Sequence, residues 1–202
     1  MLSDELPTLE IVKDKYDIKF DKYAIVMYHP VTTQISKLEK NVNTLVSFLE
    51  NSTKNYIIIY PNNDLGSNII LNAYKKLEKK ENIRIFPSIR FGKFLTLLKN
   101  CDFVIGNSSA GIRECSVYGI PTINIGSRQS GRFNIFENKN IINVENTLLE
   151  IDKIMDNIDK YRIKCFSFGK GTSCEFFIKI LETESFLNIE IQKKFNDLNR
   201  FD

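Results

Sequence analysis

The sequence predicts an α/β domain built on a parallel sheet, and three observations support this fold class. Short apolar runs rich in β-branched residues recur along the chain, as in AIVMY at 24–28 and YIIIY at 56–60. Such runs are typical of strands that are buried on both faces of a parallel sheet. Segments with helical spacing of apolar residues lie between the runs, and most connections are short. We therefore expect a single Rossmann-like domain, with helices on both faces of its sheet, followed by a helical C-terminal tail.

The remaining strands are expected in four further short segments that are mostly apolar. The third run is IRIF at 83–86, and the fourth is FVI at 103–105. TINI at 122–125 and IINV at 141–144 supply the fifth and sixth strands. Connections between parallel strands should be right-handed. The polar loop over 126–140 is unusually long for such a connection, which favours a functional role.

The spacing of apolar residues locates the helices. In the segment 34–49, Ile35, Leu38 and Val42 fall on one face, and Thr33 is the expected N-cap. Ser67 is expected to cap a helix over 67–80. The inner face expected for the helix over 88–100 consists of Phe91, Phe94, Leu95 and Leu98. The other expected helices are 112–118, 147–158, 175–181 and 189–198.

These elements set the expected domain limits. Residues 1–22 are polar, contain Pro7 and are expected to be a lead-in or linker, in which Leu9 and Val12 could share one face of a short helix. The Rossmann-like domain extends over 23–182, and 183–202 form the helical tail. The apolar face of that tail is expected to dock on a partner domain or to fold back on the chain's own core.

Composition and charge exclude several classes of protein. The 202 residues are 43% hydrophobic and 26% charged, which is ordinary for a soluble globular protein. A net charge of +3 with scattered Lys residues does not indicate nucleic-acid binding. No apolar run is long enough to span a membrane and no signal-peptide pattern is present, so a cytoplasmic location is expected. With one His and no CxxC pair among the four Cys, we expect neither a metal nor a cofactor.

The small residues GNSSAG at 106–111 form a candidate anion site before a helix. Free backbone N–H groups and the positive end of the dipole favour an anion at such a position. Ser108 and Ser109 add hydroxyl donors. Glu114 can accept hydrogen bonds from sugar hydroxyls, and Arg128 follows the next strand with a positive charge. These residues suggest a nucleoside-diphosphate site, but an ordinary Asn-Ser helix cap is the alternative. Glu114 would then be a first-turn acid that favours the helix dipole, and Arg128 would be a solvated loop charge.

Two further polar residues directly follow the first two expected strands. His29 comes at the carboxyl end of the first strand, which is the edge at which α/β sheets bind ligands. Asn62 lies in the turn that follows the second strand. Each residue has a structural alternative, because His29 could simply end its strand and Asn62 could serve only to form the turn.

Four spaced motifs give the chain a resemblance to a known family: HPVTT at 29–33, PNND-G at 61–66, GNSSAGIRE and GIPTINIGSRQ-GR. In this order, over 23–174, they resemble the C-terminal half of the hydrolysing UDP-N-acetylglucosamine 2-epimerases, in the branch that feeds sialic and nonulosonic acid synthesis. The resemblance implies a glycosyltransferase-B-like architecture. In that architecture the active site lies between two Rossmann-like halves, and this chain matches the second, nucleotide-binding half.

The resemblance also implies roles for individual residues around the candidate anion site. Ser108 and Ser109 would hold the pyrophosphate, together with the N–H groups around Ala110 and Gly111. Glu114 would hold the ribose hydroxyls. This set of residues would therefore bind the ribose and the two phosphates of a UDP-sugar.

Four more positions match the motifs of the family or the segments between them. Arg128 would contact the uridine-phosphate side of the ligand, and the backbone near Ile89 would face the uracil. Asn62 is expected at the edge of the substrate. His29 matches the active-site histidine of the family and would neutralise or protonate the departing diphosphate.

The expected function is that of a hydrolysing epimerase represented by its UDP-binding half. The family reaction eliminates UDP from UDP-N-acetylglucosamine, or from a 2,4-diacetamido relative, and adds water to the glycal to give the free manno-configured sugar. The essential carboxylates of the family come mostly from its N-terminal half. A separate chain carrying that half is therefore a candidate partner beside the UDP-sugar, and a homo-oligomer is expected. The alternatives are a non-catalytic UDP-sugar-binding module or fragment, and a glycosyltransferase domain of the same fold.

Overall fold

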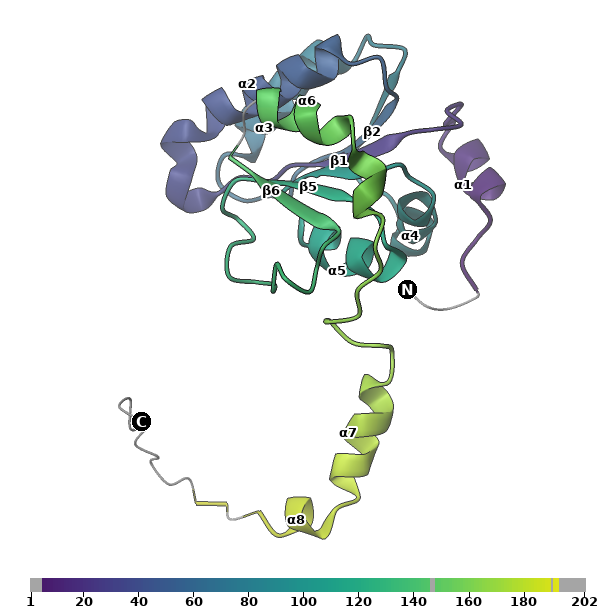
Figure 1. Cartoon of the computed structure of the whole chain (residues 1–202), viewed down its shortest axis with the longest axis vertical. Helices are drawn as coiled ribbons and strands as arrows, with labels where there is room; N and C mark the ends of the chain where they lie inside the picture. The colour runs from purple at the N-terminus through teal and green to yellow at the C-terminus, as the bar shows by residue number, and fades with distance from the viewer. Residues whose placement is uncertain (1–4, 146–147, 190, 193–202) are drawn as a thin grey trace. The chain divides into compact units, whose positions relative to one another are not determined.

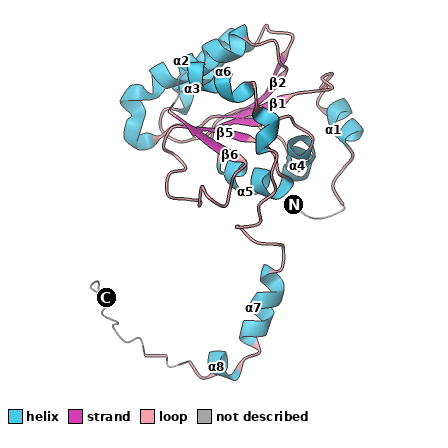
Figure 2. Ribbon diagram, in the orientation of Figure 1, coloured by secondary structure: helices cyan, strands magenta, loops and turns pink. Residues whose placement is uncertain are grey.

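Six parallel strands form one sheet in the order β3-β2-β1-β4-β5-β6 (Figures 1 and 2). The computed structural model describes residues 5–145, 148–189 and 191–192. Its described residues up to Phe168 form one compact unit, and those from Gly169 onward form a second. The strands are β1 (Ala24–Met27), β2 (Tyr56–Ile59), β3 (Ile83–Phe86), β4 (Val104–Gly106), β5 (Thr122–Ile125) and β6 (Ile141–Val144). The prediction of an α/β fold with a parallel sheet is therefore confirmed.

Helices cover both faces of this sheet (Figure 1). On one face, α2 (Ile35–Asn51) contacts α3 (Ser67–Tyr74) and α6 (Leu148–Met155). On the other face, α4 (Phe91–Lys99) lies between α1 (Leu9–Lys15) and α5 (Ser109–Tyr118) and contacts both. Short 3-10 helices occupy Thr32–Gln34, Lys75–Leu77 and Ile158–Tyr161.

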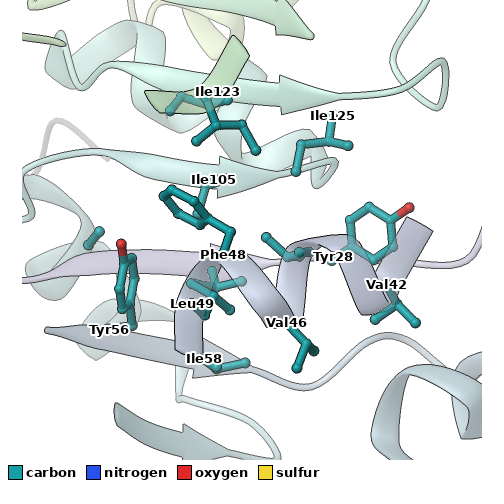
Figure 3. Packing of buried hydrophobic residues seen from close by; sticks show 14 of the residues in the cluster. Tyr28, Val42, Val46, Phe48, Leu49, Tyr56, Ile58, Ile105, Ile123 and Ile125 are labelled. Carbon is teal, nitrogen blue, oxygen red and sulfur yellow. The ribbon is translucent and has the colours of Figure 1, made fainter. Parts of the chain in front are cut away.

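The residues of β1 alternate between two hydrophobic clusters, one on each face of the sheet. Val26 belongs to the cluster beneath α2, and Ile25 belongs to the cluster beneath α4. Parallel pairing places Val26 opposite Ile58 of β2 and Ile105 of β4. Figure 3 shows Ile58 and Ile105 in the first cluster, together with Leu49 of α2. The run at 24–28 is apolar throughout because both faces of its strand are buried.

The N-terminal helix α1 is part of the first unit. It lies within the segment 1–22, for which the sequence predicts a lead-in, and its Val12 is fully buried. Ile18, which follows the helix, is also buried. Both residues belong to the cluster that α4 helps to form, so the described part of this segment adds apolar surface to the core.

The starts of two helices differ from the expected caps. The expectation that Thr33 caps α2 is wrong, because Thr33 lies inside a 3-10 turn and the helix begins at Ile35 without a side-chain cap. The expected cap at Ser67 is also wrong, because Ser67 is the first helical residue of α3 and Gly66 precedes it with a φ of +96°. A positive φ favours glycine, so the backbone of Gly66 sets the start of α3.

Helices α4 and α5 also begin elsewhere than expected. Helix α4 begins at Phe91, not at residue 88, and the expectation that Phe91 faces inward is wrong because it is 59% exposed. Leu97 is fully buried on α4 in addition to the expected inner residues. Helix α5 begins at Ser109, three residues earlier than expected, because the Ser108 hydroxyl accepts a hydrogen bond from the Ala110 N–H (3.4 Å). A side-chain cap of this kind extends the helix toward its N-terminus.

The second unit contains α7 (Ser173–Leu181) and α8 (Glu184–Leu187). Its helices carry large apolar side chains that are exposed, namely Phe176, Phe177, Ile178, Ile180, Phe186 and Leu187. In the expected helix over 189–198, Ile189, Ile191 and Gln192 are not helical. The rest of that expected helix lies outside the described residues. None of the described helices has the length and apolar character needed to cross a bilayer.

Candidate functional site

Two loops meet at the carboxyl edge of the sheet, where the strand order reverses. β1 and β4 are the two central strands of the sheet, and the chain continues from β1 to β2 on one side and from β4 to β5 on the other. Because the loops after β1 and β4 lead in opposite directions, a crevice opens between them. His29 follows β1 and Asn107 follows β4. The His29 N–H donates to Asn107 Oδ1 (2.7 Å), and Asn107 Nδ2 donates to the His29 carbonyl (2.9 Å). His29 therefore lies at the topological switch point.

Gly106 allows β1 and β4 to approach closely at this edge. It pairs with Met27 and has a φ of +140°. A Cβ atom at position 106 would lie 2.0 Å from the Met27 carbonyl oxygen. That oxygen accepts a hydrogen bond from the Asn107 N–H (3.0 Å). A residue without a side chain is therefore required directly before Asn107.

The imidazole of His29 is held in one orientation. Its Nδ1 accepts a hydrogen bond from the Asn62 N–H (3.1 Å), so the neutral ring carries its proton on Nε2. Burial, together with the positive charge of Arg128, lowers the pKa of His29 from 6.5 to about 4, although Asn62 and Asp64 oppose this shift. At neutral pH, His29 is therefore an uncharged hydrogen-bond donor through Nε2.

This environment predicts a pH dependence of stability. Between pH 6.5 and 4 the unfolded chain binds a proton on His29 that the folded chain does not bind. The free energy of unfolding should therefore fall by about 3 kcal/mol as the pH is lowered through this range, with no further loss from His29 below pH 4. The measurement is urea denaturation of the wild type and of His29→Gln at several pH values. A difference between the two proteins that does not change with pH would contradict the prediction.

An apolar hollow of about 340 Å³ lies at the same edge of the sheet. It brings together four of the predicted site residues, since His29, Asn62, Ile89 and Ser108 all line it. Phe94 of α4 is a further apolar lining residue. A flat apolar ring with polar groups at its border would fit such a hollow.

The N-terminus of α5 lies next to a second hollow of about 260 Å³. Ser109, the first residue of the helix, lines it with Ile112, Arg113, Gln129 and Arg132. Its lining is polar and cationic, in contrast to that of the first hollow. The two predicted serines therefore face different hollows, since Ser108 lines only the apolar one.

Two of the N–H groups expected to bind a pyrophosphate have partners within the chain. The Ala110 N–H donates to the Ser108 hydroxyl, and the Gly111 N–H donates to the Ser108 carbonyl (3.1 Å). Gly111 also has a structural role, because a Cβ atom there would lie 2.8 Å from Thr122 Cγ2. The Thr122 hydroxyl donates to the Gly111 carbonyl (2.8 Å). Gly111 thus lets α5 pack closely against β5.

Arg128 reaches the switch point from the loop after β5. Its Nη1 donates to the Asn107 carbonyl (3.2 Å), and Nε2 of the neighbouring Gln129 donates to the same oxygen (2.8 Å). Burial and the nearby Arg132 lower the pKa of Arg128, but a guanidinium stays charged at neutral pH. Asn107 and Gln129 were not singled out from the sequence, although Asn107 belongs to the GNSS motif and is only 1% exposed.

Glu114 lies on α5, one turn after Ala110, and lines neither of the two hollows. Burial raises the pKa of its carboxyl group, although a backbone hydrogen bond and Arg113 partly oppose that shift. Among the residues that the structure describes, no three His, Cys, Asp or Glu side chains gather as metal ligands.

The strand order and the residues gathered at its reversal define a doubly wound α/β domain with a candidate ligand site at the switch point. The chain belongs to the UDP-N-acetylglucosamine 2-epimerase family, whose model matches residues 2–182. It is 40% identical over 211 residues to a UDP-N-acetylglucosamine 2-epimerase of Neisseria meningitidis serogroup B, covering 98% of this chain and 53% of the relative. The family resemblance expected from the four motifs is therefore confirmed.

Two other similar proteins extend this comparison. A GDP/UDP-N,N'-diacetylbacillosamine 2-epimerase (hydrolyzing) of Campylobacter jejuni is 31% identical over 154 residues, which cover 73% of this chain and 38% of the relative. A Methanocaldococcus jannaschii UDP-GlcNAc 2-epimerase, solved in complex with UDP-GlcNAc and UDP, matches with a TM-score of 0.66. That match has 22% identity, covers 85% of this chain and 48% of the solved chain, and shows the shared fold. The chain spans about half the length of these relatives, or less.

Proposed function

We propose that the chain binds the UDP portion of a UDP-sugar and is the nucleotide-binding half of a hydrolysing UDP-N-acetylglucosamine 2-epimerase. The observation that carries the proposal is the pairing of an uncharged donor, His29 Nε2–H, with a cation, Arg128, beside the N-terminus of α5. Departing UDP gains negative charge on its diphosphate, which a hydrogen-bond donor and a fixed positive charge both stabilise. The relatives named for UDP-sugar chemistry support the choice of ligand.

In the proposed reaction, the bond between C1 of the sugar and the diphosphate oxygen breaks while a base removes the proton from C2. Water then adds to the glycal and gives the free sugar. His29 donates to the diphosphate oxygen that receives the electron pair, and Arg128 compensates the charge. The residues that line the two hollows include no Asp or Glu, so we assign the base to the part of the relatives that this chain does not span.

The absence of a carboxylate from the lining of the hollows favours one second function, a UDP-sugar-binding module without catalysis. The two functions differ in whether this chain, once joined by a complementary chain, releases UDP from UDP-N-acetylglucosamine. For the catalytic function we propose a complementary chain as partner, a homo-oligomeric assembly and a cytoplasmic location. The cysteines of the described residues are unpaired, which favours that location.

The proposal predicts that the whole chain binds UDP and that Ser109→Ala weakens this binding. The hydroxyl of Ser109 lies at the first position of α5, where it can donate to a phosphate oxygen. Losing a hydrogen bond to a charged group should raise the Kd by about 10- to 100-fold, measured by isothermal titration calorimetry. Ser67→Ala is the matched control, because Ser67 is the first residue of another helix and lines neither hollow. Absence of saturable binding by the wild type would overturn the proposed nucleotide site.

A further inference from the structure

Asn107 connects the three segments that form the switch point. Its side chain makes two hydrogen bonds to the main chain of His29, and its main-chain carbonyl accepts from Arg128 and Gln129. Its own N–H donates to the Met27 carbonyl. The residue is 1% exposed, so water does not compete for these bonds. A single residue thus joins the loop after β1 to the loop after β5.

We propose that Asn107 is a positioning residue, which holds His29 and Arg128 in one fixed arrangement so that both face the departing diphosphate. The catalytic role of this arrangement rests on the proposed function. The arrangement itself is independent of that function, because contacts within the chain form it. Asn107 acts through His29 and Arg128 and need not touch the substrate.

The chemistry of the contacts explains why asparagine is needed at this position. The side chain must accept from the His29 N–H and donate to the His29 carbonyl at the same time, and an amide group provides both functions. An ionised aspartate would only accept and would repel the carbonyl. The last β1–β4 backbone pair is Met27 with Gly106, so the Asn107 side chain extends the pairing of the two loops beyond the strands.

The two sets of contacts can be separated by mutation. Arg128 and Gln129 bind the main-chain oxygen of residue 107, which Asn107→Ala retains. The same substitution removes both hydrogen bonds to His29. We therefore expect that in Asn107→Ala the loop that carries His29 becomes more mobile, while Arg128 keeps its hydrogen bond to the main-chain carbonyl of residue 107.

The single histidine of the chain allows this change to be measured directly. In whole chain labelled with 15N-histidine, the imidazole NMR signals report the tautomer and the titration of His29. The wild type should show one tautomer, with the proton on Nε2, and a pKa of about 4. In Asn107→Ala the main chain of His29 loses both hydrogen bonds to residue 107, so we expect the ring to shift and its hydrogen bond from the Asn62 N–H to weaken. The signals should then become those of a tautomer mixture, and the pKa should move toward the ordinary 6.5. The charged groups that act on His29, Arg128 and Asp64, are unchanged in this variant.

Asn124→Ala is the matched control, because Asn124 is also a buried asparagine, but its side chain donates its hydrogen bond to Asn143 of β6. It should lower thermal stability without changing the His29 spectrum. Asn107→Asp is a second variant of the same shape, and it should also change the tautomer and the pKa of His29. If both Asn107 variants kept the wild-type tautomer and titration, Asn107 would be a structural residue only and the proposal would be overturned.

Titration with UDP separates this proposal from the proposed function. Asn107→Ala should bind UDP with a Kd within about threefold of the wild-type value, because the main-chain contact that holds Arg128 remains. A much larger loss of affinity would mean that Arg128 moves with the side chain, against the proposed separation. If the wild type did not bind UDP, the proposed function would fail, whereas the imidazole spectra would still decide the role of Asn107.

Discussion

Replacing Gly106 by alanine is expected to lower the free energy of unfolding by at least about 4 kcal/mol. The φ of +140° at this position is strained for any residue with a side chain. The added methyl group would also lie 2.0 Å from the Met27 carbonyl oxygen and 2.5 Å from its carbon. Both neighbours are backbone atoms of β1, so relief requires β1 and β4 to separate at the centre of the sheet. Urea denaturation followed by circular dichroism measures the loss.

A second glycine provides the control for this experiment. In Gly92→Ala the added methyl group meets no atom within 4 Å, and the residue lies in α4. Its stability should be unchanged or raised by up to about 1 kcal/mol, because alanine is the better helix former. If Gly106→Ala were as stable as Gly92→Ala, β1 and β4 could not approach each other as closely as the structure shows.

His29→Ala is expected to lower turnover by about 10²- to 10⁴-fold in an assembly that contains this chain and hydrolyses UDP-N-acetylglucosamine. The substitution removes the Nε2–H donor that the departing diphosphate would use. The affinity for UDP should change much less, because in the proposed site Arg128 and the N-terminus of α5 would provide most of the attraction for the phosphates. Steady-state kinetics of UDP release, together with calorimetric titration of UDP, measures both quantities.

Ser109→Ala provides the contrast, since it should mainly weaken UDP binding and affect turnover at saturating substrate much less. The proposed division of roles requires that the two variants differ in this way. If both variants changed only affinity, and to a similar extent, His29 would not act on the leaving group. Normal turnover in His29→Ala would instead favour another chemistry on the same fold.

The strands were the part of the fold that sequence reasoning predicted best. The runs at 56–60 and 83–86 differ from β2 and β3 by at most one residue. In β2 the first three residues are buried, and burial of a central strand on both faces requires an uninterrupted apolar run. The edge strand β3 includes Arg84 and is recognisable from its isoleucines and phenylalanine. The helix starts were predicted less well, as Thr33 and Ser67 show. Whether a hydroxyl caps a helix depends on the backbone conformation around it, and at α3 that conformation belongs to Gly66.

The candidate site was predictable one residue at a time, but not as a connected group. The positions of His29 and Asn62 after strands, and of Ser108 and Ser109 before a helix, are visible in the sequence. The two hydrogen bonds between Asn107 and His29, and those that Arg128 and Gln129 donate to Asn107, join segments that lie far apart along the chain. Polar loops have no periodicity that would indicate such contacts, so only the folded structure reveals them.

The pairing of β1 with β4 also has a consequence for the synthesis of the protein on the ribosome. Val26 pairs with Ile58 on one side and with Ile105 on the other, so β1 remains an open edge until β4 has emerged. An apolar strand with an unpaired edge is prone to intermolecular association. During synthesis, the edge of β1 that will pair with β4 therefore stays exposed to other chains until α2, β2, α3, β3 and α4 have been made. The segment that carries Asn107 directly after β4 is thus also the segment that covers the open edge of β1.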